Sequence, residues 1–458
     1  MEKIVVLKIG GGILRDKDSF LRVVNIISNK KNLGEKQIVV ISALFGVTDF
    51  LIDSMSKCAL GKTEVMSIIN SLKETHLQYL SFIDDLSIRQ KAEFALNEKI
   101  SLLEKFLFGI SYLKEISPRS KDFIQSFGER LSPIVLEAFL LNNKIATEFI
   151  DAEEAGIICE GNFENALAVM PKTTTNLQNN VLPLLSGKVV LLPGYYGVDE
   201  LGEVKTFGRG GTDYSSGFIA NIFDARLEIW KDVSGFMTAD PKVIPSAKQI
   251  PLLSYDEAEE LGYLGAKILH PKTIAPLREK ALCAEIKNVF APEVLGTIIC
   301  GEKDSNPGIV KSIAPKKDIS VISIESIAMI NFPGFASGLF SILSESGISV
   351  DLIVTSEASI SFSVETKFAD AAFVAIEEIK KVYPSTISMQ KNLAMISVIG
   401  EGMKNSYGVA GKVFSALGAE KVNVELISQG ASEINISFVV KKEDLERAML
   451  VVHEEFFN

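Results

Sequence analysis

Residues 206–213 read TFGRGGTD, a stretch that concentrates three glycines, an arginine and an aspartate in one loop. Glycine has no Cβ, so such a backbone can approach a ligand closely and turn its N–H groups inward, as phosphate-binding loops require. Arg209 and Asp213 place opposite charges beside these glycines. We interpret the loop as a binding site for a polar ligand; the alternative is a glycine-rich surface turn with two solvated charges.

Short apolar runs alternate with longer amphipathic stretches over the first two thirds of the chain. The runs, rich in β-branched residues and typical of central parallel strands, are residues 4–7, 38–41 and 189–192. The stretches with an apolar residue at every third or fourth position are residues 20–28, 64–82, 88–114 and 131–141. This alternation predicts a layered α/β domain.

Three glycine-rich or polar loops fall where ligands bind in such domains, beyond the carboxyl ends of strands. They are residues 10–12, 42–48 and 208–213. The first follows its strand directly in LKIGGGI, so the ammonium group of Lys8 is expected at the strand end beside the glycines. The spacing differs from a Walker A loop, in which the lysine follows the glycines.

Composition excludes several classes of protein. The length of 458 residues predicts about three domains, and the net charge of −11 argues against a nucleic-acid partner. Four cysteines and three histidines are scattered without metal-binding spacing, so no metal ligands are predicted. The apolar runs are too short for a signal peptide or a membrane span, and we therefore expect a cytoplasmic protein with no membrane partner.

The order of the motifs resembles the aspartate kinases of the amino-acid kinase superfamily. The matching segments are KIGGG, SALFGVTD, SFGER, GRGGTD, KDVSGFMTADPK and GAKILHPKT. The resemblance implies a layered αβα, carbamate-kinase-like α/β catalytic domain that transfers the γ-phosphoryl group of MgATP to the side-chain carboxylate of L-aspartate. Because that carboxylate is already ionised at neutral pH, positioning and charge neutralisation replace a catalytic base.

The resemblance also implies roles for individual residues. Lys8 would neutralise the transferring phosphoryl group, and Asp213 would hold Lys8 in place. Arg209 would clamp the α-carboxylate of aspartate, since its planar guanidinium matches a carboxylate. Glu129 would accept the substrate ammonium; the alternative is a helix-start carboxylate that interacts with the helix dipole. The remaining substrate-binding residues implied are Ser42, Ala43, Thr48, Tyr195 and Thr212.

ATP and Mg²⁺ are the implied cofactors, and no protein metal ligand is assigned. The nucleotide-binding residues implied besides Lys8 are Gly10, Gly11, Gly210, Gly211, Lys231, Asp232, Met237, Lys242 and Lys267.

Two positions depart from the family pattern. Gly12 and Ile13 stand where the family commonly has two hydroxyl residues, and Met237 stands where an aromatic residue is frequent. These departures leave two alternatives open: a catalytically degenerate amino-acid-binding regulator, or a kinase of another acidic amino acid. The SFGER segment and the features of the last third of the chain favour aspartate.

The last third of the chain contains an internal repeat. A gapless shift of 74 residues aligns Ile322 with Ile396, Gly334 with Gly408, Phe340 with Phe414, Val350 with Val424 and Ile360 with Ile434. Helical spacing followed by strand spacing predicts two copies of a βαββα unit. Because the second copy lacks a counterpart of the strand at residues 386–389, we expect the copies to pair or share strands. The domain boundaries predicted are 1–303 for the catalytic domain, 304–318 for a linker, and 319–390 and 391–458 for the two copies.

The two copies resemble ACT domains, ferredoxin-like α+β modules that sense amino acids. The effector implied by the resemblance is L-lysine, with Asp351 pairing with its side-chain ammonium and Glu425 as the equivalent in the second copy. The alternative is a pair of dimerisation domains without a ligand. A homodimer through the ACT domains and a kinase without a fused homoserine dehydrogenase are expected. The effector-binding residues implied are Met329, Phe332, Gly334, Phe335, Ala336, Ser349, Val350, Asp351, Thr355, Ser356 and Glu357.

Overall fold

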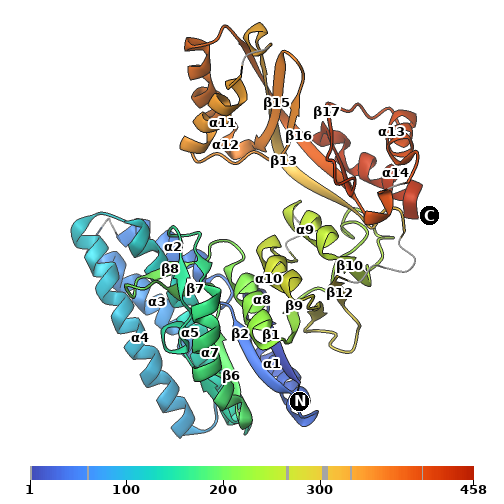
Figure 1. Ribbon diagram of the computed structural model, residues 1–458. Helices are drawn as coiled ribbons and strands as arrows, with labels where there is room; N and C mark the ends of the chain where they lie inside the picture. The colour runs from blue at the N-terminus through green and yellow to red at the C-terminus, as the bar shows by residue number, and fades with distance from the viewer. Residues whose placement is uncertain are drawn as a thin grey trace. The chain divides into compact units, whose positions relative to one another are not determined.

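The computed structural model describes residues 3–58, 61–264, 268–301, 308–330, 333–404 and 406–457. The chain divides into two compact units, each seen in Figure 1. Unit 1 comprises Met1–Phe236, Pro251–Ala258 and Lys267–Glu302, and unit 2 comprises Met237–Ile250, Glu259–Ala266 and Lys303–Asn458. Among the described helices, none is long and apolar enough to cross a bilayer.

Unit 1 is built on an eight-stranded sheet with the order β10-β12-β11-β9-β1-β2-β6-β3. All neighbouring strands are parallel except β11 and β12. The strands are β1 (Ile4–Ile9), β2 (Lys36–Ile41), β3 (Thr147–Phe149), β6 (Val189–Pro193), β9 (Arg226–Lys231), β10 (Leu252–Ser254), β11 (Ala284–Asn288) and β12 (Thr297–Cys300). Two small hairpins pair β4 (Cys159–Glu160) with β5 (Leu167–Ala168) and β7 (Tyr196–Val198) with β8 (Val204–Thr206). The layered α/β domain predicted from the sequence is confirmed.

Helices cover both faces of this sheet (Figure 1). They are α1 (Lys17–Asn32), α2 (Val47–Cys58), α3 (Lys62–Leu80), α4 (Leu86–Leu113), α5 (Pro118–Asn142), α6 (Ala152–Ala155), α7 (Met170–Asn180), α8 (Gly211–Phe223) and α10 (Ile274–Glu279). Helix α9 (Tyr255–Tyr263) is divided between the units. Short 3₁₀ helices are η1 (Gly11–Ile13), η2 (Leu182–Ser186) and η3 (Pro271–Thr273).

Strand alternation decides which side chains of β1 face which layer of helices. Val5, Leu7 and Ile9 join one apolar core with residues of α1 to α5. Successive strand residues point to opposite faces, so Lys8 points to the other face, where α8 packs against β1, β2 and β9. The alternation therefore brings Lys8 toward the α8 layer.

Helix α5 is longer than the sequence analysis predicted. It begins at Pro118 rather than near residue 131, with Ser117 as the N-cap and Pro118 in its first turn. Glu129 consequently lies in the middle of α5, and the interpretation as a helix-start carboxylate is wrong.

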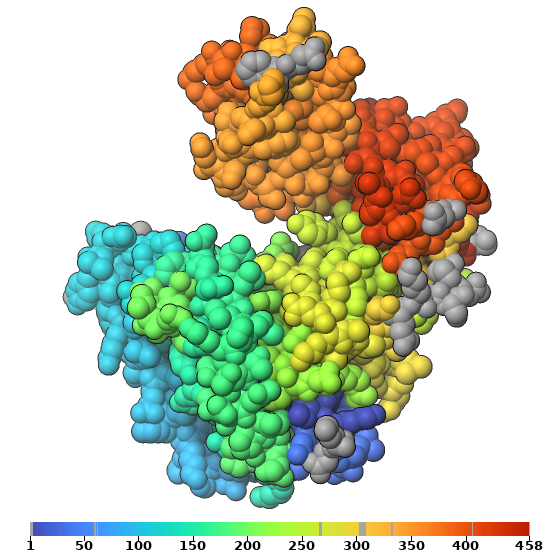
Figure 2. Space-filling view, in the orientation of Figure 1, coloured from blue at the N-terminus to red at the C-terminus, as the bar shows by residue number. Residues whose placement is uncertain are grey.

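Unit 2 carries both βαββα copies on one six-stranded antiparallel sheet with the order β14-β15-β13-β16-β18-β17. The first copy contains β13 (Ser312–Glu325), η4 (Ile327–Met329), α11 (Phe335–Glu345), β14 (Ile353–Thr355), β15 (Ser359–Glu365), α12 (Thr366–Ile376) and η5 (Glu377–Lys381). The second contains β16 (Thr386–Ile399), η6 (Glu401–Met403), α13 (Val409–Ala419), β17 (Leu426–Gln429), β18 (Asn435–Lys441), η7 (Lys442–Asp444) and α14 (Leu445–Phe457). The long strands β13 and β16 pair at the centre, and the copies abut in the space-filling view, orange against red (Figure 2).

Equivalent contacts recur in the two copies. Ser323 and Ser361 join their hydroxyls at 2.8 Å in the first copy, and Ser397 and Ser437 do so at 2.6 Å in the second. Ser323 and Ser397 are 74 residues apart, as the repeat in the sequence requires. Ser361 and Ser437 are 76 residues apart, so β18 lies two residues further along the chain than a gapless shift places it.

The alignment of Ile360 with Ile434 is therefore wrong. Ile360 pairs with Ile324 on β13, and the corresponding pair on β16 is Val398 with Ile436. The connection from β17 to β18 is longer than that from β14 to β15, which accounts for the slip.

Candidate active site

The carboxyl ends of four neighbouring strands form one edge of the unit 1 sheet. The strands β9, β1, β2 and β6 are consecutive in the sheet. Lys231 ends β9, Lys8 is next to last in β1, Ser42 follows β2, and Tyr195 follows β6. Parallel strands thus bring together residues from four distant parts of the sequence, at the edge where α/β domains bind ligands.

A carboxylate held between two ammonium groups lies at this edge. Lys8 Nζ lies 2.7 Å from Asp213 Oδ1, and Lys231 Nζ lies 3.8 Å from Asp213 Oδ2. Burial alone would raise the pKa of Asp213, but Lys231 and Lys8 outweigh it and lower the pKa to about 2. The three groups carry a net positive charge, which favours an anionic ligand.

Helix α8 contributes its N-terminus to the same edge. Asp213 lies in the first turn of α8, which Gly210 caps with a left-handed φ of 74°. The positive end of the helix dipole adds to the field of the two lysines. The sequence motif GRGGTD is therefore the loop and first turn of this helix.

Gly210 is required by a close neighbour as well as by its φ angle. A Cβ on Gly210 would lie 2.2 Å from Cγ of His270. His270 Nδ1 accepts the backbone N–H of Lys272, and Lys272 Nζ in turn donates to the carbonyl oxygen of Phe207 at 3.0 Å. These contacts hold both ends of the loop that carries Arg209. The side chain of Arg209 is exposed and makes no hydrogen bond or ion pair to any described residue.

The first glycine loop packs tightly against the second loop. A Cβ on Gly11 would lie 2.5 Å from the carbonyl oxygen of Ala43. Gly10 donates its N–H to the carbonyl oxygen of Trp230 at 3.3 Å, so that donor is already engaged. The glycines therefore permit close packing of β1, β2 and β9 ends in addition to any contact with a ligand.

Glu129 carries a buried carboxyl group that forms no ion pair with any residue that the structure describes. Its side chain is 3% exposed, and its Oε1 accepts a long hydrogen bond of 3.4 Å from Thr212 Oγ1. Oε2 has no hydrogen-bond partner within the part of the chain that the structure describes. Burial raises the pKa of Glu129 to about 8, against smaller opposing effects from the Ala43 backbone and Thr212. A positively charged ligand group would satisfy this carboxylate.

Gly128 lets the second loop approach Glu129. A Cβ on Gly128 would lie 2.7 Å from Cβ of Ala43 and 3.4 Å from Oγ1 of Thr48. The loop is also held by Ser132, whose Oγ donates to the carbonyl oxygen of Ser42 at 2.7 Å. Helix α5 therefore carries both the carboxylate and the surface that seats residues 42–48.

Tyr195 lies beside Gln125 and Gly211 at the same edge of the sheet. Its hydroxyl donates to Oε1 of Gln125 at 2.6 Å, and its N–H donates to Oγ of Ser215 at 3.1 Å. Its ring lies against Gly211, where an added Cβ would come within 2.8 Å of Cδ2. Sequence analysis missed Gln125, although it lies one helical turn before Glu129, on the same face of α5.

A buried ionic network that the sequence did not reveal lies next to Glu129 and Tyr195. Arg130 Nη1 lies 3.0 Å from Asp151 Oδ2, and Tyr196 donates its hydroxyl to the other oxygen of Asp151. Burial would raise the pKa of Asp151, but Arg130 and Lys99 lower it to about 2. Arg130 and Tyr196 are the chain neighbours of Glu129 and Tyr195, so the network fixes the backbone that presents both.

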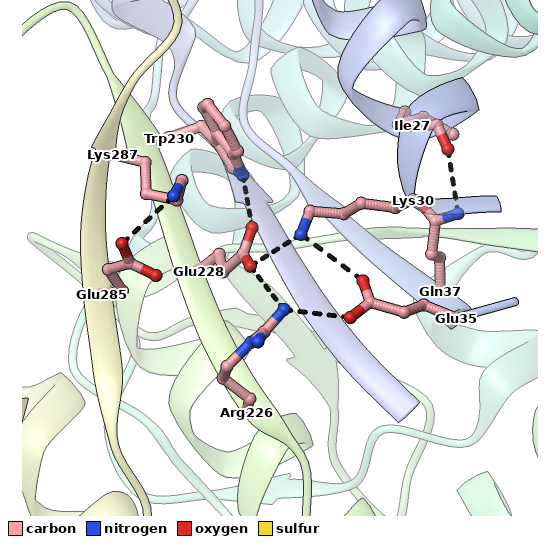
Figure 3. A network of polar contacts seen from close by, with 9 residues as sticks. All are labelled: Ile27, Lys30, Glu35, Gln37, Arg226, Glu228, Trp230, Glu285 and Lys287. Atoms are coloured by element: carbon pink, nitrogen blue, oxygen red, sulfur yellow. Dashed lines mark hydrogen bonds and ion pairs between the residues drawn. The ribbon is translucent and has the colours of Figure 1, made fainter. Parts of the chain in front are cut away.

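A second network fixes β9 from the opposite face (Figure 3). Glu228 accepts hydrogen bonds from Lys30 Nζ at 2.7 Å, Arg226 Nη2 at 2.8 Å and Trp230 Nε1 at 3.1 Å. It lies on the α1 side of the sheet, whereas Lys231 lies on the α8 side. We assign it to stability of the strand rather than to ligand binding.

The other nucleotide-binding candidates are not part of the cluster formed by Lys8, Asp213 and Lys231. Asp232 is half exposed, 3.6 Å from Arg15 Nη2. Met237 and Lys242 belong to unit 2. Lys267 lies outside the described residues.

The described effector candidates lie in the first ACT copy. Met329 ends η4, Gly334 caps α11 with a φ of 106°, and Phe335 is buried beneath it. Asp351 is ion-paired with Lys316 at 2.6 Å. Phe332 lies outside the described residues, and the exposed or partly exposed remainder is Ala336, Ser349, Val350, Thr355, Ser356 and Glu357.

Known proteins match both parts of the chain. Residues 3–288 match the amino acid kinase family, and residues 322–379 and 396–456 match the ACT domain. Aspartokinase 3, chloroplastic, of Arabidopsis thaliana is 33% identical over 477 residues, which cover 99% of this chain and 81% of the relative.

Two crystal structures of Escherichia coli aspartokinase III also match, each at 27% identity with a TM-score of 0.83. One, in the R-state, contains aspartate and ADP, and the match covers 100% of both chains. The other, in the T-state, contains lysine and aspartate, and the match covers 99% of this chain and 100% of that one.

Proposed function

The chain belongs to the amino acid kinase family, and we propose that it is an ATP-dependent aspartate kinase regulated through its ACT domains. The observation that carries this proposal is that a site suited to an anion and a site suited to a cation lie at the same edge of the sheet. The cluster of Lys8, Asp213 and Lys231 favours phosphate, and one oxygen of the buried Glu129 has no hydrogen-bond partner among the described residues. An amino acid whose carboxylate accepts a phosphoryl group satisfies both.

In the reaction, MgATP supplies the γ-phosphoryl group, which passes to a side-chain oxygen of aspartate as its bond to the β-phosphate breaks and ADP leaves. Lys8 and Lys231 stabilise the charge that spreads over the transferring group, and Asp213 keeps their ammonium groups in place. No proton has to be removed from the ionised acceptor.

Glu129 and Arg209 orient the acceptor in this proposal. Glu129 accepts the α-ammonium group, and its unpartnered oxygen supports the assignment. Arg209 binds the α-carboxylate, because its exposed side chain is not paired with any residue in the described part of the chain. Ser42, Ala43, Thr48, Tyr195 and Thr212 line the rest of the pocket. With its α-carboxylate and α-ammonium groups bound in this way, the substrate directs its side-chain carboxylate toward Lys8.

The residues gathered at the sheet edge fit a nucleotide. Gly10, Gly11, Gly210 and Gly211 are assigned to the nucleotide site in this proposal because close packing at these glycines brings the strand ends and the start of α8 together. In the described ranges, no group of three or more His, Cys, Asp or Glu side chains could hold a metal ion. In this proposal Mg²⁺ is bound with the phosphates of the nucleotide.

The departure at Ile13 does not argue for a degenerate site. Ile13 is 1% exposed and belongs to the core shared with α1 to α5. Its side chain therefore packs into the core and replaces none of the charged groups Lys8, Glu129, Arg209 and Asp213.

L-lysine is the proposed effector, bound by the first ACT copy, and the proposed assembly is a homodimer through the ACT domains. The location proposed is the cytoplasm, where ATP and free amino acids are available. The proposed domain boundaries remain 1–303, 319–390 and 391–458, with a linker between the first two.

The proposal is tested by trapping the acyl phosphate with hydroxylamine. Purified full-length protein should form a hydroxamate that requires both MgATP and L-aspartate. Glutamate, acetylglutamate and carbamate should give less than about 1% of that rate, because their lengths or charges mismatch the pocket. A higher rate with glutamate would favour a kinase of another acidic amino acid. Binding of lysine without any hydroxamate would favour the degenerate regulator.

A further inference from the structure

Asp122 on α5 carries a fully buried carboxylate whose hydrogen bonds go to segments that are distant in the chain. Its Oδ2 accepts two backbone N–H groups, from Thr206 at 2.7 Å and from Glu164 at 2.9 Å. Its Oδ1 accepts the hydroxyl of Thr206, which is also fully buried, at 3.0 Å. Hydrogen bonds to an ionised acceptor are stronger than those between neutral groups, so this carboxylate fixes the segments that supply its donors.

Thr206 begins the loop that carries Arg209. It ends β8, and its carbonyl oxygen accepts the N–H of Ala166 at 3.0 Å, so both of its backbone polar groups are bound. The next residue, Phe207, is fully buried, and its N–H donates to the carbonyl oxygen of Tyr195 at 2.8 Å. Arg209 follows three residues after Thr206 with an exposed side chain. The place from which its guanidinium extends therefore depends on where Thr206 and Phe207 are held.

The other residue held by Asp122 packs against the same loop. Glu164 has a left-handed φ of 62°, and a Cβ on Gly208 would lie 2.2 Å from its carbonyl oxygen. Lys121, the chain neighbour of Asp122, is ion-paired with the side chain of Glu164. Asp122 therefore holds the loop at two points, directly at Thr206 and through Glu164 at Gly208.

One face of α5 carries three of these polar residues. Asp122, Gln125 and Glu129 are three and four residues apart, a spacing that places them on the same side of a helix. Gln125 accepts the hydroxyl of Tyr195, and Glu129 is the proposed acceptor of the substrate ammonium. The α-ammonium and α-carboxylate groups of an amino acid are bonded to the same carbon atom. The distance between Glu129 and Arg209 must match that geometry, so a small shift of the loop relative to α5 should weaken binding.

We propose that Asp122 is a positioning residue for the amino-acid substrate, because it holds the loop of Arg209 in register with Glu129. This inference rests on the proposed aspartate kinase function and adds a buried residue that acts through Arg209 without contacting the substrate. The α-carboxylate is bound equally before and during phosphoryl transfer. Loss of Asp122 should therefore raise the KM for aspartate and leave kcat nearly unchanged. The alternative is that Asp122 only stabilises the fold of unit 1.

Asp122→Ala tests the proposal because it removes the acceptor of all three donors, whereas Asp122→Asn keeps an oxygen for the two N–H groups. In Asp122→Ala we expect the KM for aspartate to rise about tenfold, together with the aspartate Kd measured by calorimetry on the full-length protein with MgADP bound. Asp122→Asn should recover most of this affinity. The KM for ATP and the Kd for MgADP should stay within about twofold in both variants, which also shows that the catalytic unit is folded.

A double-variant cycle separates positioning from stability. If Asp122 acts through Arg209, Asp122→Ala should change the aspartate Kd by less than about twofold when Arg209→Ala is already present. An equal increase with and without Arg209→Ala would overturn the proposal. Unchanged aspartate affinity in the single variant Asp122→Ala would overturn it as well.

The matched control is Glu137→Ala, which removes another carboxylate of α5 that binds a distant backbone N–H. Its Oε1 accepts the N–H of Phe149 on β3 at 2.9 Å. This variant should lower the thermal stability but keep the KM for aspartate within about twofold, and an aspartate defect as large as that of Asp122→Ala would overturn the proposal. A wild-type protein that binds aspartate without forming a hydroxamate would contradict the proposed function alone, and the comparison of Kd values would still decide the role of Asp122. A wild-type protein that binds no aspartate would overturn both.

Discussion

Lys316 Nζ lies 2.6 Å from Asp351 Oδ1, so the carboxylate expected to bind an effector ammonium already holds an ammonium group of the chain. The two side chains are 20% and 17% exposed, and the other oxygen of Asp351 is buried without a hydrogen-bond partner among the described residues. A lysine effector would have to compete with Lys316 or add to the site through the second oxygen.

Lys316→Met should strengthen inhibition by lysine. Removing the internal competitor should lower the half-inhibitory lysine concentration about fivefold, which corresponds to about 1 kcal/mol for a partly exposed ion pair. The measurement is a lysine titration of the initial rate at fixed aspartate and ATP. Lys317→Met, at the exposed neighbouring position, should leave the titration unchanged. Weaker inhibition in Lys316→Met would show that the pair supports effector binding instead.

Aspartate binding should depend on pH through Glu129. Its pKa of about 8 in the ligand-free protein means that the carboxyl is protonated at neutral pH. Binding of the substrate ammonium should ionise it, so affinity should rise about tenfold per pH unit and level off above about pH 8. Calorimetry in two buffers of different ionisation enthalpy should detect proton release at pH 7.

The same pKa has a consequence for stability without ligand. Because the pKa in the folded state is raised, the contribution of Glu129 to the free energy of unfolding is fully present below about pH 4.5. This contribution is lost as the pH rises through about 8. Glu129→Gln should remove both this loss and the proton release, and it should weaken aspartate binding while leaving MgADP binding intact. Proton release that persists in Glu129→Gln would exclude this carboxyl as its source.

Gly128→Ala should impair aspartate binding selectively. The added Cβ would lie 2.7 Å from Cβ of Ala43 and must displace the loop at residues 42–48. Overpacking of this kind costs about 1–3 kcal/mol, so the KM for aspartate should rise about tenfold with little change for ATP. Gly109→Ala on α4, where nothing lies within 4 Å of the added Cβ, is the matched control and should not change either KM. Equal increases in both KM values would indicate general damage to the sheet edge.

The strand ends of the catalytic unit could be predicted from the sequence because short apolar runs fix where parallel strands stop. Lys8 and residues 42–48 follow directly from that pattern, and the structure brings them together. The start of α5 could not be predicted from periodicity, since Gln125, Glu129 and Arg130 are polar yet buried. Polar residues that find partners inside a protein break the rule that the polar face of a helix is exposed.

Packing between segments that are distant in the sequence could not be predicted either. Ala239 lies in a motif that resembles a nucleotide-binding segment, and Ile244 follows two residues after that motif. Nothing in the local sequence shows that these two side chains join the core of the second ACT copy. The ion pair of Asp351 could not be predicted either, because its partner Lys316 lies on β13, 35 residues earlier in the chain.

The most direct test of the account is the rate of aspartate-dependent hydroxamate formation by Lys8→Met. Loss of an ammonium group that stabilises the transferring phosphoryl should lower this rate at least about 100-fold. Binding of lysine should remain at the wild-type affinity, and Lys31→Met, an exposed lysine on α1, should retain full activity. A Lys8→Met protein that turns over aspartate and MgATP at a rate close to that of the wild type would contradict the account.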